Sequence, residues 1–488
     1  MTSTSAVPSP VEADPRRWKA LVVIAIAQLM IVLDASIVNI ALPSIQADLG
    51  ISDADRQWAV TAYTLAFGSL LLLGGRIADY AGRKRVFIIG LTGFALASAL
   101  GGLATTSTML FASRGLQGVF AALLAPAALS LISVTFTDSK ERAKAFGVYG
   151  ALSGGGAAIG LVLGGVLTEY FSWHWCFLVN VPIAVLAIFL AIPNVRESRA
   201  TGNTKYDVPG AITATVGLFC LVFGITKAES DGWNGTSTVT FLAISVVLLF
   251  VFLFIEYKST HPLLPLKIVL ERNRGGAYLS SFFVGVGLFS MFLFISYFFQ
   301  AVLQYSPLTS GLLFLPFSAG VVISAGIASQ LLPRFGPRWV TFTGFVMAVI
   351  GMSLYIRLTP ESTYVSGILP SIILMSLGMG LIFVPLSATA LYGVGDHDAG
   401  VASAVLNTAQ QIGGSIGVAF LNTIAASATA AFVVSNNLQQ PNADALVEGF
   451  TTTFMWSTAI LAFAGLVWVV LVRISKKDLS KNDVAAQF

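Results

Sequence analysis

The residue best placed to do chemistry in this chain is Asp34, the one carboxylate in an otherwise apolar run from Leu21 to Pro43. A charge in such a run is costly in lipid, so an ionisable residue there faces protein or water and usually has a function. An aspartate at that depth can take up and release a proton. Its expected partner is Arg114, the only Lys or Arg deep inside any other apolar run.

The surroundings of Arg114 allow two interpretations of this pair. Arg114, Gln117 and Gly118 are spaced i, i+3 and i+4, so they share one face of a helix. A buried arginine keeps its proton and needs a counter-charge. The pair either joins two helices as a fixed ion pair, or supplies a fixed positive charge that tunes the proton affinity of Asp34. We favour the second interpretation, because such residues are rare within membrane spans.

The composition places these residues in a membrane protein. The 488 residues are 56% hydrophobic and 10% charged, with a mean hydropathy of +0.83, whereas soluble proteins carry about 25% charged residues. About 20 apolar residues suffice for a helix to cross a bilayer, and the chain holds fourteen such runs. They are too uniformly apolar for barrel strands. We therefore predict an all-α polytopic membrane protein with fourteen transmembrane helices and no separate soluble domain.

The positive charges predict how the chain is oriented. Of the 27 Lys and Arg residues, all but four lie in alternate loops. The exceptions are Arg56, Lys227 and Arg357 in the opposite loops, and Arg114 within a span. Because positive residues collect in cytoplasmic loops, both termini are expected in the cytoplasm. This arrangement requires an even number of spans, which fits fourteen and would also fit twelve.

A weak internal repeat predicts the organisation of the chain. The segment Arg76–Arg85 resembles Gln330–Trp339 when Gly82 is aligned with Gly336. Two six-helix halves with a substrate path between them are a common plan for secondary transporters. The predicted parts are an N-terminal six-helix half (residues 1–195), an inserted helix pair with linkers (196–274), and a C-terminal six-helix half with a tail (275–488).

A loop after the second run contains the most specific short motif. It reads Gly75-Arg-Ile-Ala-Asp79-Tyr-Ala-Gly82-Arg83 and resembles the signature loop between helices two and three of the major facilitator superfamily. We expect the glycines to permit a tight turn and close helix approach, and Asp79 to cap a helix. Arg83 is expected to bridge Asp79 to Asp138. The resemblance implies a latch at the cytoplasmic side; the alternative is a topological signal without a gating role.

Other segments resemble one branch of this superfamily. The stretch from Leu33 to Pro43 is similar to LDxTIVNVALP, Arg114 to Gly118 to RxxQG, and Trp173 to Pro182 to WRWIFxINVP. The fifth run is similar to the antiporter motif, with Leu161 in place of its proline. Together they resemble the fourteen-helix drug:proton antiporters, the EmrB/QacA-like multidrug exporters of bacteria. The residues matching the antiporter motif are Gly147, Gly156, Gly160, Gly164 and Gly165.

This resemblance implies proton-coupled efflux of lipophilic drugs, antibiotics or secondary metabolites across the bacterial plasma membrane. Asp34 would carry the proton. We expect a monomer in the lipid bilayer that is not an enzyme, binds no nucleic acid, metal or cofactor, and draws energy from the proton gradient. No nucleotide-binding loop of the G-x-x-x-x-G-K-[ST] type is present. The expected substrate-path residues are Asn39, Tyr63, Phe67, Gln117, Tyr297, Gln300, Gln304 and Gln410.

Other functions remain compatible with the sequence. A proton-coupled importer could use the same fold, and Leu161 keeps it open because the proline that bends the antiporter helix is missing. An exporter of lipids or cell-envelope precursors is a second alternative. A membrane sensor is a third, although such sensors usually have a soluble signalling domain. Cys176 and Cys220 are expected to be buried small side chains rather than a disulfide.

Overall fold

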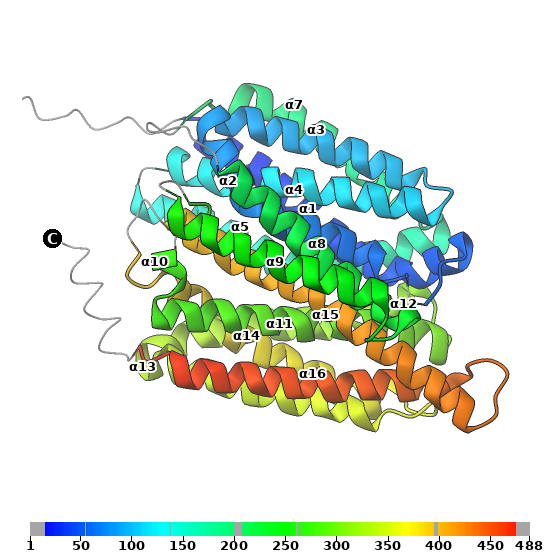
Figure 1. Cartoon of the computed structure of the whole chain (residues 1–488). Helices are drawn as coiled ribbons and strands as arrows, with labels where there is room; N and C mark the ends of the chain where they lie inside the picture. The colour runs from blue at the N-terminus through cyan, green and yellow to red at the C-terminus, as the bar shows by residue number, and fades with distance from the viewer. Residues whose placement is uncertain are drawn as a thin grey trace, which may run out of the picture.

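The computed structural model is a bundle of long helices (Figure 1). It describes residues 15–53, 55–136, 138–199, 207–259, 262–264, 266–394 and 399–474, and no strand occurs in these ranges. Up to residue 195 the helices are α1 (Arg17–Leu49), α2 (Trp58–Ala81), α3 (Arg83–Gly102), α4 (Ser107–Thr135), α5 (Ser139–Tyr170), α6 (Trp175–Leu178) and α7 (Asn180–Asn194). The next are α8 (Val208–Asp231), α9 (Thr236–Lys258) and α10 (Leu266–Val269). The last are α11 (Arg272–Tyr297), the π-helix η1 (Phe298–Val302), α12 (Pro307–Leu313), α13 (Leu315–Leu354), the 3₁₀ turn η2 (Tyr355–Arg357), the π-helix η3 (Tyr364–Ile368), α14 (Leu369–Leu391), α15 (Ala399–Ser435) and α16 (Ala443–Leu471).

The number of membrane passes agrees with the prediction from the sequence. Twelve helical stretches in the described residues are long and apolar enough to cross a membrane. One of them, Pro307–Arg357, is broken at Gly336, where φ is 76° and ψ is 164°, so it makes two passes. The 32 residues of α5, rising about 1.5 Å each, make another pass. The chain is therefore a multi-pass membrane protein, and the residues that the structure describes make fourteen passes.

Two aligned glycines support the internal repeat. Gly82 has a φ of 116° and Gly336 a φ of 76°, a region that glycine adopts at little cost. Gly82 separates α2 from α3, and Gly336 separates the two passes of α13. Each glycine thus turns the chain between two consecutive passes, as expected if the two segments are copies of one unit.

The bundle has two apolar clusters, and they meet toward one of its two ends. The described chain begins and ends at the same end (Figure 1), which we call the terminal end; the opposite end, where α1 passes to α2, is the distal end. One apolar cluster fills α1 to α4 and α7. A second fills the helices from α11 onward and includes the distal part of α1, from Leu33 to Ile45. The two groups of helices therefore share an apolar core toward the distal end.

Helices α8 and α9 lie between these two groups in Figure 1. α8 packs on α9, α2 and α15, through an apolar cluster that includes Leu65, Val222 and Ala419. α9 is largely exposed: Phe250 is 69% and Phe254 62% accessible. Exposed phenylalanines on a membrane helix face lipid, so α9 forms the outer surface of the pair.

Glycines bring α2 and α4 into backbone contact. A Cβ atom on Gly118 would lie 2.4 Å from the carbonyl oxygen of Tyr63, and one on Gly74 would lie 1.9 Å from that of Ala122. Small residues allow this approach in membranes, where tight packing replaces the hydrophobic effect between helices. Gly75, the glycine predicted from the sequence to allow close approach, faces α4 more loosely: a Cβ there would lie 3.5 Å from Pro126 Cβ, an ordinary contact. The approach places Arg114 of α4 against α2.

Gly118→Ala should destabilise the protein, because the added methyl group has no room beside the Tyr63 carbonyl. Overpacking of this kind costs about 1–3 kcal/mol. Gly115→Ala is the matched control: it is on the same helix, and a Cβ there meets nothing within 4 Å. We expect Gly115→Ala to be neutral or to stabilise by about 0.5–1 kcal/mol. Thermal unfolding of the purified protein in detergent measures both; equal effects of the two substitutions would contradict this packing.

Candidate transport site

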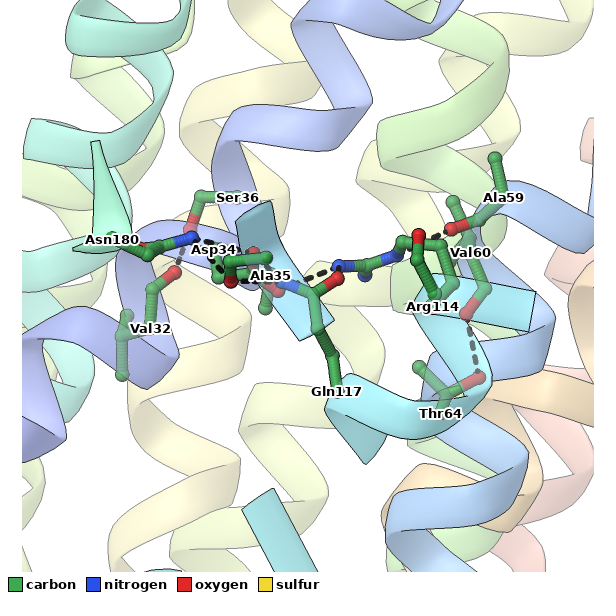
Figure 2. A network of polar contacts seen from close by, with 12 residues as sticks. Val32, Asp34, Ala35, Ser36, Ala59, Val60, Thr64, Arg114, Gln117 and Asn180 are labelled. Carbon is green, nitrogen blue, oxygen red and sulfur yellow. Dashed lines mark hydrogen bonds and ion pairs between the residues drawn. The ribbon is translucent and has the colours of Figure 1, made fainter. Parts of the chain in front are cut away.

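Asp34 lies in the middle of α1 and is completely buried. Its Oδ2 accepts a hydrogen bond of 2.6 Å from an Nη atom of Arg114. Its Oδ1 accepts bonds of 2.8 Å from Gln117 Nε2 and 2.9 Å from Asn180 Nδ2. Figure 2 shows these side chains converging on Asp34 from two other helices, α4 and α7. Every partner of the carboxylate is a donor, which is the arrangement that a buried negative charge requires.

Arg114 is 1% exposed and as fully satisfied as Asp34. The Nη atom that binds Asp34 also donates to Gln117 Oε1 at 2.7 Å, and Nε donates to the carbonyl oxygen of Ala59 at 2.8 Å. The guanidinium lies 4.5 Å from the centre of the Tyr63 ring, a distance typical of cation–π attraction. These contacts tie α4 to α1 and α2, so the sequence prediction that Asp34 meets Arg114 is correct in its geometry.

Asn180 and Ser98 complete the cluster, and we did not assign either to it from the sequence. Asn180 is the first residue of α7, just after the short helix α6. The Oγ atom of Ser98, on α3, accepts bonds of 2.6 Å from Gln117 Nε2 and 3.4 Å from Asn180 Nδ2. Both residues are fully buried. The available signal was an asparagine in the apolar stretch from Trp173 to Pro182.

The expected antiporter glycines place α5 along α1, beside the cluster. A Cβ atom on Gly160 would meet Ser36 Cβ at 2.7 Å, and one on Gly164 would meet the Ile37 carbonyl oxygen at 3.1 Å. Gly156 is similarly close to Val32, at 3.1 Å. This stripe therefore faces α1 directly on either side of Asp34. Gly165 faces α12, where a Cβ would lie 2.6 Å from Leu308 Cα. The contacts of Gly147 lie outside the part of α5 whose surroundings the structure describes.

The signature loop has different contacts from those expected. Arg83 binds Asp79, four residues earlier, at 2.8 and 3.0 Å. The N-terminus of α3 is capped by Glu197, which accepts from the backbone N–H groups of Lys84 and Arg85 at 3.1 and 3.2 Å. The prediction that Asp79 caps a helix is therefore wrong. Glu197 leaves no room for a side chain at Gly82, since a Cβ there would lie 2.8 Å from Oε1.

Asp138 does not pair with Arg83 in this structure. It is the N-cap of α5, and its carboxylate accepts from the backbone N–H of Glu141 at 2.9 Å. A carboxylate at a helix N-terminus is favourable for both hydrogen bonding and the helix dipole. The expected bridge from Asp79 through Arg83 to Asp138 is thus only half formed. The predicted latch role of this loop remains a prediction.

The predicted substrate-path residues lie in three different places. Tyr63 and Phe67 are buried beside Arg114, with ring centres 5.7 Å apart. Asn39 donates to the Ala35 carbonyl oxygen of its own helix, α1, at 3.0 Å. Gln410 is half-buried where α15 meets Gly285 of α11. The others, Tyr297, Gln300 and Gln304, lie near the distal end.

A polar seam closes the distal end between the two groups of helices. Arg56 is 4% exposed; its Nε donates to Asn422 of α15 at 3.1 Å, and its guanidinium lies 4.2 Å from the ring centre of Tyr297. Tyr297 donates its hydroxyl hydrogen to Gln46 of α1. Gln300 donates to the Ile40 carbonyl oxygen at 2.9 Å. Sequence reasoning assigned Arg56 only to a loop and did not predict the seam.

The described residues contain no group of three or more His, Cys, Asp or Glu side chains that could hold a metal ion. Cys176 and Cys220 are buried and unpaired with one another. The central cluster holds one ionisable carboxylate beside one fixed positive charge.

Solved structures with a similar fold are membrane transporters. A bacterial homologue of the human lysosomal transporter Spinster aligns with a TM-score of 0.68 and 17% identity, covering 95% of this chain and 98% of that one. A structure titled for proton-dependent oligopeptide transporters aligns with a TM-score of 0.63 and 16% identity, covering 93% and 98%. At these identities the likeness establishes the fold alone: a polytopic helical bundle of the transporter type.

Sequence comparison gives the family. Residues 24–418 match the Major Facilitator Superfamily, and the chain belongs to it. The puromycin resistance protein of Streptomyces alboniger is 47% identical over 94% of this chain and 92% of its own length. The cephamycin export protein CmcT of Amycolatopsis lactamdurans is 38% identical over 84% and 85%. The tetracenomycin C resistance and export protein of Streptomyces glaucescens is 34% identical over 87% and 80%.

Arg114→Gln should destabilise the protein strongly, because it leaves the Asp34 carboxylate buried without its counter-charge. Breaking a buried ion pair on one side costs about 3–5 kcal/mol. The double variant Asp34→Asn/Arg114→Gln removes both charges and should regain much of that loss. Unfolding midpoints of the four proteins in the cycle measure the coupling energy. If the losses of stability of the two single variants add in the double variant, the two charges do not stabilise one another.

Proposed function

We propose that this protein exports a lipophilic antibiotic or secondary metabolite from a bacterial cell in exchange for protons, by alternating access. The observation that carries the proposal is the buried Asp34, hydrogen-bonded to Arg114, Gln117 and Asn180 in mid-span. Ionisable residues at such depth usually serve ion or proton movement. A fixed positive charge at 2.6 Å lets small movements of Arg114 change how tightly Asp34 holds a proton.

The relatives support the substrate class. Their names include resistance to puromycin and tetracenomycin C, and export of cephamycin and tetracenomycin C. Puromycin is the first substrate to test, since the puromycin resistance protein is 47% identical over 94% of this chain. A monocationic or neutral compound fits better than a dication, because Asp34 is the one acid in the middle of the described spans.

The proposed orientation places the terminal end, with both chain termini, in the cytoplasm and the distal end outside. The distribution of Lys and Arg over alternate loops supports it. Protons would enter from outside, where the membrane potential contributes about 2.3 kcal/mol per charge per 100 mV. The protein would act as a monomer in the bilayer, as a transporter and not an enzyme, without a cofactor and without nucleic acid.

In this orientation the structure is closed toward the outside. Hydrogen bonds between the helices up to α7 and those from α11 onward, among the described residues, all lie toward the distal end. They join Arg56 to Asn422, Asn422 to Asp53, Gln46 to Tyr297, Ile40 to Gln300 and Glu169 to Leu308. Export by alternating access requires these bonds to break when the site faces outward.

Asp34→Asn should abolish proton-driven export, because the amide cannot exchange a proton. The measurement is puromycin efflux from loaded bacteria that express the protein, with and without a proton uncoupler. Efflux by the native protein should be sensitive to the uncoupler, and efflux by Asp34→Asn should fall to the level of cells without the protein. Glu361→Gln, an exposed acid in a distal loop, is the control and should export normally.

Two outcomes of this experiment would redirect the proposal. Uncoupler-sensitive efflux that survives in Asp34→Asn would place the proton site elsewhere. Accumulation of puromycin in expressing cells would indicate import. If no drug moves but the lipid or cell-envelope composition changes on expression, export of an envelope precursor becomes the better proposal.

Arg56→Gln should favour the state that is open at the distal end. It removes the positive charge from bonds to Asn422 and Asp53 and from the Tyr297 ring. A hydrogen bond to a charged group contributes about 1.5–3 kcal/mol, so its loss would shift a two-state population about tenfold or more. Labelling of Gln300→Cys by a membrane-impermeant maleimide should accelerate accordingly, in a background with Cys176 and Cys220 replaced by alanine.

Arg272→Gln provides the control for this labelling, because Arg272 lies at the terminal end and bonds within its own group of helices, to the Val470 carbonyl oxygen. It should leave the labelling rate of Gln300→Cys unchanged. Equal labelling rates in the native and Arg56→Gln proteins would show that the seam does not hold the distal end closed.

A further inference from the structure

The hydrogen bonds around Asp34 satisfy its charged carboxylate but not its protonated form, and proton transport requires both forms. Its three partners, Arg114, Gln117 and Asn180, all donate to the carboxylate. A protonated carboxyl group is itself a donor and needs an acceptor for its O–H. A buried donor left without a partner costs about 1–3 kcal/mol. Some neighbour must therefore change its hydrogen bonding when the proton arrives.

Arg114 and Gln117 are poorly suited to accept this proton's hydrogen bond. Arg114 has no acceptor atom. Gln117 has one, Oε1, but it already accepts from Arg114 at 2.7 Å, and its Nε2 donates to both Asp34 and Ser98. Turning the Gln117 amide would place its NH₂ group against the arginine and break all three bonds.

Asn180 is free of these constraints. Its Nδ2 donates to Asp34 at 2.9 Å and to Ser98 Oγ at 3.4 Å, whereas its Oδ1 is buried and has no hydrogen-bond partner. The charge on Asp34 fixes this orientation, because the opposite one would set two oxygen atoms against each other. An amide turned by 180° would present Oδ1 to a protonated Asp34, and besides the bond to Asp34 it would give up only the longer bond from Nδ2 to Ser98. Ser98, 3.4 Å from Nδ2, could then donate its hydroxyl hydrogen to the same oxygen.

We propose that Asn180 is a positioning residue for the transported proton. It donates to the Asp34 carboxylate, and its amide turns about the Cβ–Cγ bond to accept from the Asp34 O–H after protonation. The proton comes from water and forms an O–H bond at Oδ1 of Asp34. When the proton leaves, the amide of Asn180 returns to its original orientation. This inference rests on the proposed role of Asp34, and it explains how one buried pocket holds both charge states of the carboxyl group.

The test follows the side-chain amide of Asn180 while Asp34 titrates. The full-length protein is labelled with ¹⁵N-asparagine, placed in lipid nanodiscs and studied by NMR between acidic and alkaline pH. The signal of Asn180 is the one that disappears in Asn180→Ser. The carboxyl C=O band that disappears in Asp34→Asn reports protonation of Asp34 by infrared spectroscopy. We expect the Asn180 signal to shift with the same midpoint as this band.

Two controls separate the proposed amide turn from a general response to pH. Asn422 is a fully buried amide in the distal seam, and its signal should not follow the carboxyl band. Asp34→Asn presents a permanent N–H donor, as the protonated acid presents its O–H. In this variant the Asn180 signal should stay at its acidic position at every pH.

Each contrary result has a distinct meaning. An Asn180 signal that does not move while the Asp34 band titrates would overturn this inference and leave the proton site intact. A carboxyl band that never appears would overturn the proton site, and the amide turn with it. A merely structural Asn180, holding the start of α7, would lower stability when replaced but would give no signal that follows the charge on Asp34.

Discussion

The arrangement of the first seven helices depends on the cost of burying the charge of Asp34. A carboxylate with no exposure to solvent needs a counter-charge and donors for its lone pairs. The counter-charge is on α4, one amide donor is beside it, and the other is at the start of α7. Helices α4 and α7 can therefore occupy only a narrow range of positions around α1. The hydrogen bonds specify the site more sharply than apolar packing alone could do.

Glycines make this geometry possible, because the donors reach Asp34 only if the helix backbones nearly touch. Gly118 lets α4 approach Tyr63 of α2, which places the Arg114 guanidinium within reach of the Ala59 carbonyl oxygen. On the other side, Gly160 and Gly164 bring α5 against α1. At these points one of the two helices contributes no side chain to the contact. Such surfaces permit one helix to shift along another without repacking large side chains.

The sequence predicts those features that a single unusual residue reveals. Asp34 and Arg114 are rare charges in apolar runs, and Gln117 follows Arg114 at helical spacing, so their meeting could be predicted, as could the helical membrane fold. Asn180 could not, because an amide near the end of a span is ambiguous until α7 is packed on α1. The cap from Glu197 and the seam around Arg56 also depend on contacts between residues far apart in the chain. The role of Gly74 could not be predicted, because helix rotation is not fixed by the local sequence.

Helix α1 connects the proton site to the distal seam. Six residues separate Asp34 from Ile40, whose carbonyl oxygen accepts from Gln300 across the seam, and this corresponds to about 9 Å along a helix. One turn and a half further on, Gln46 accepts from Tyr297. A rigid helix that moves when Asp34 loses or gains its charge must move these two acceptors as well. Because α1 meets α5 through glycines, such a movement meets little steric resistance there, and the strength of the seam would then determine whether protonation opens the distal end.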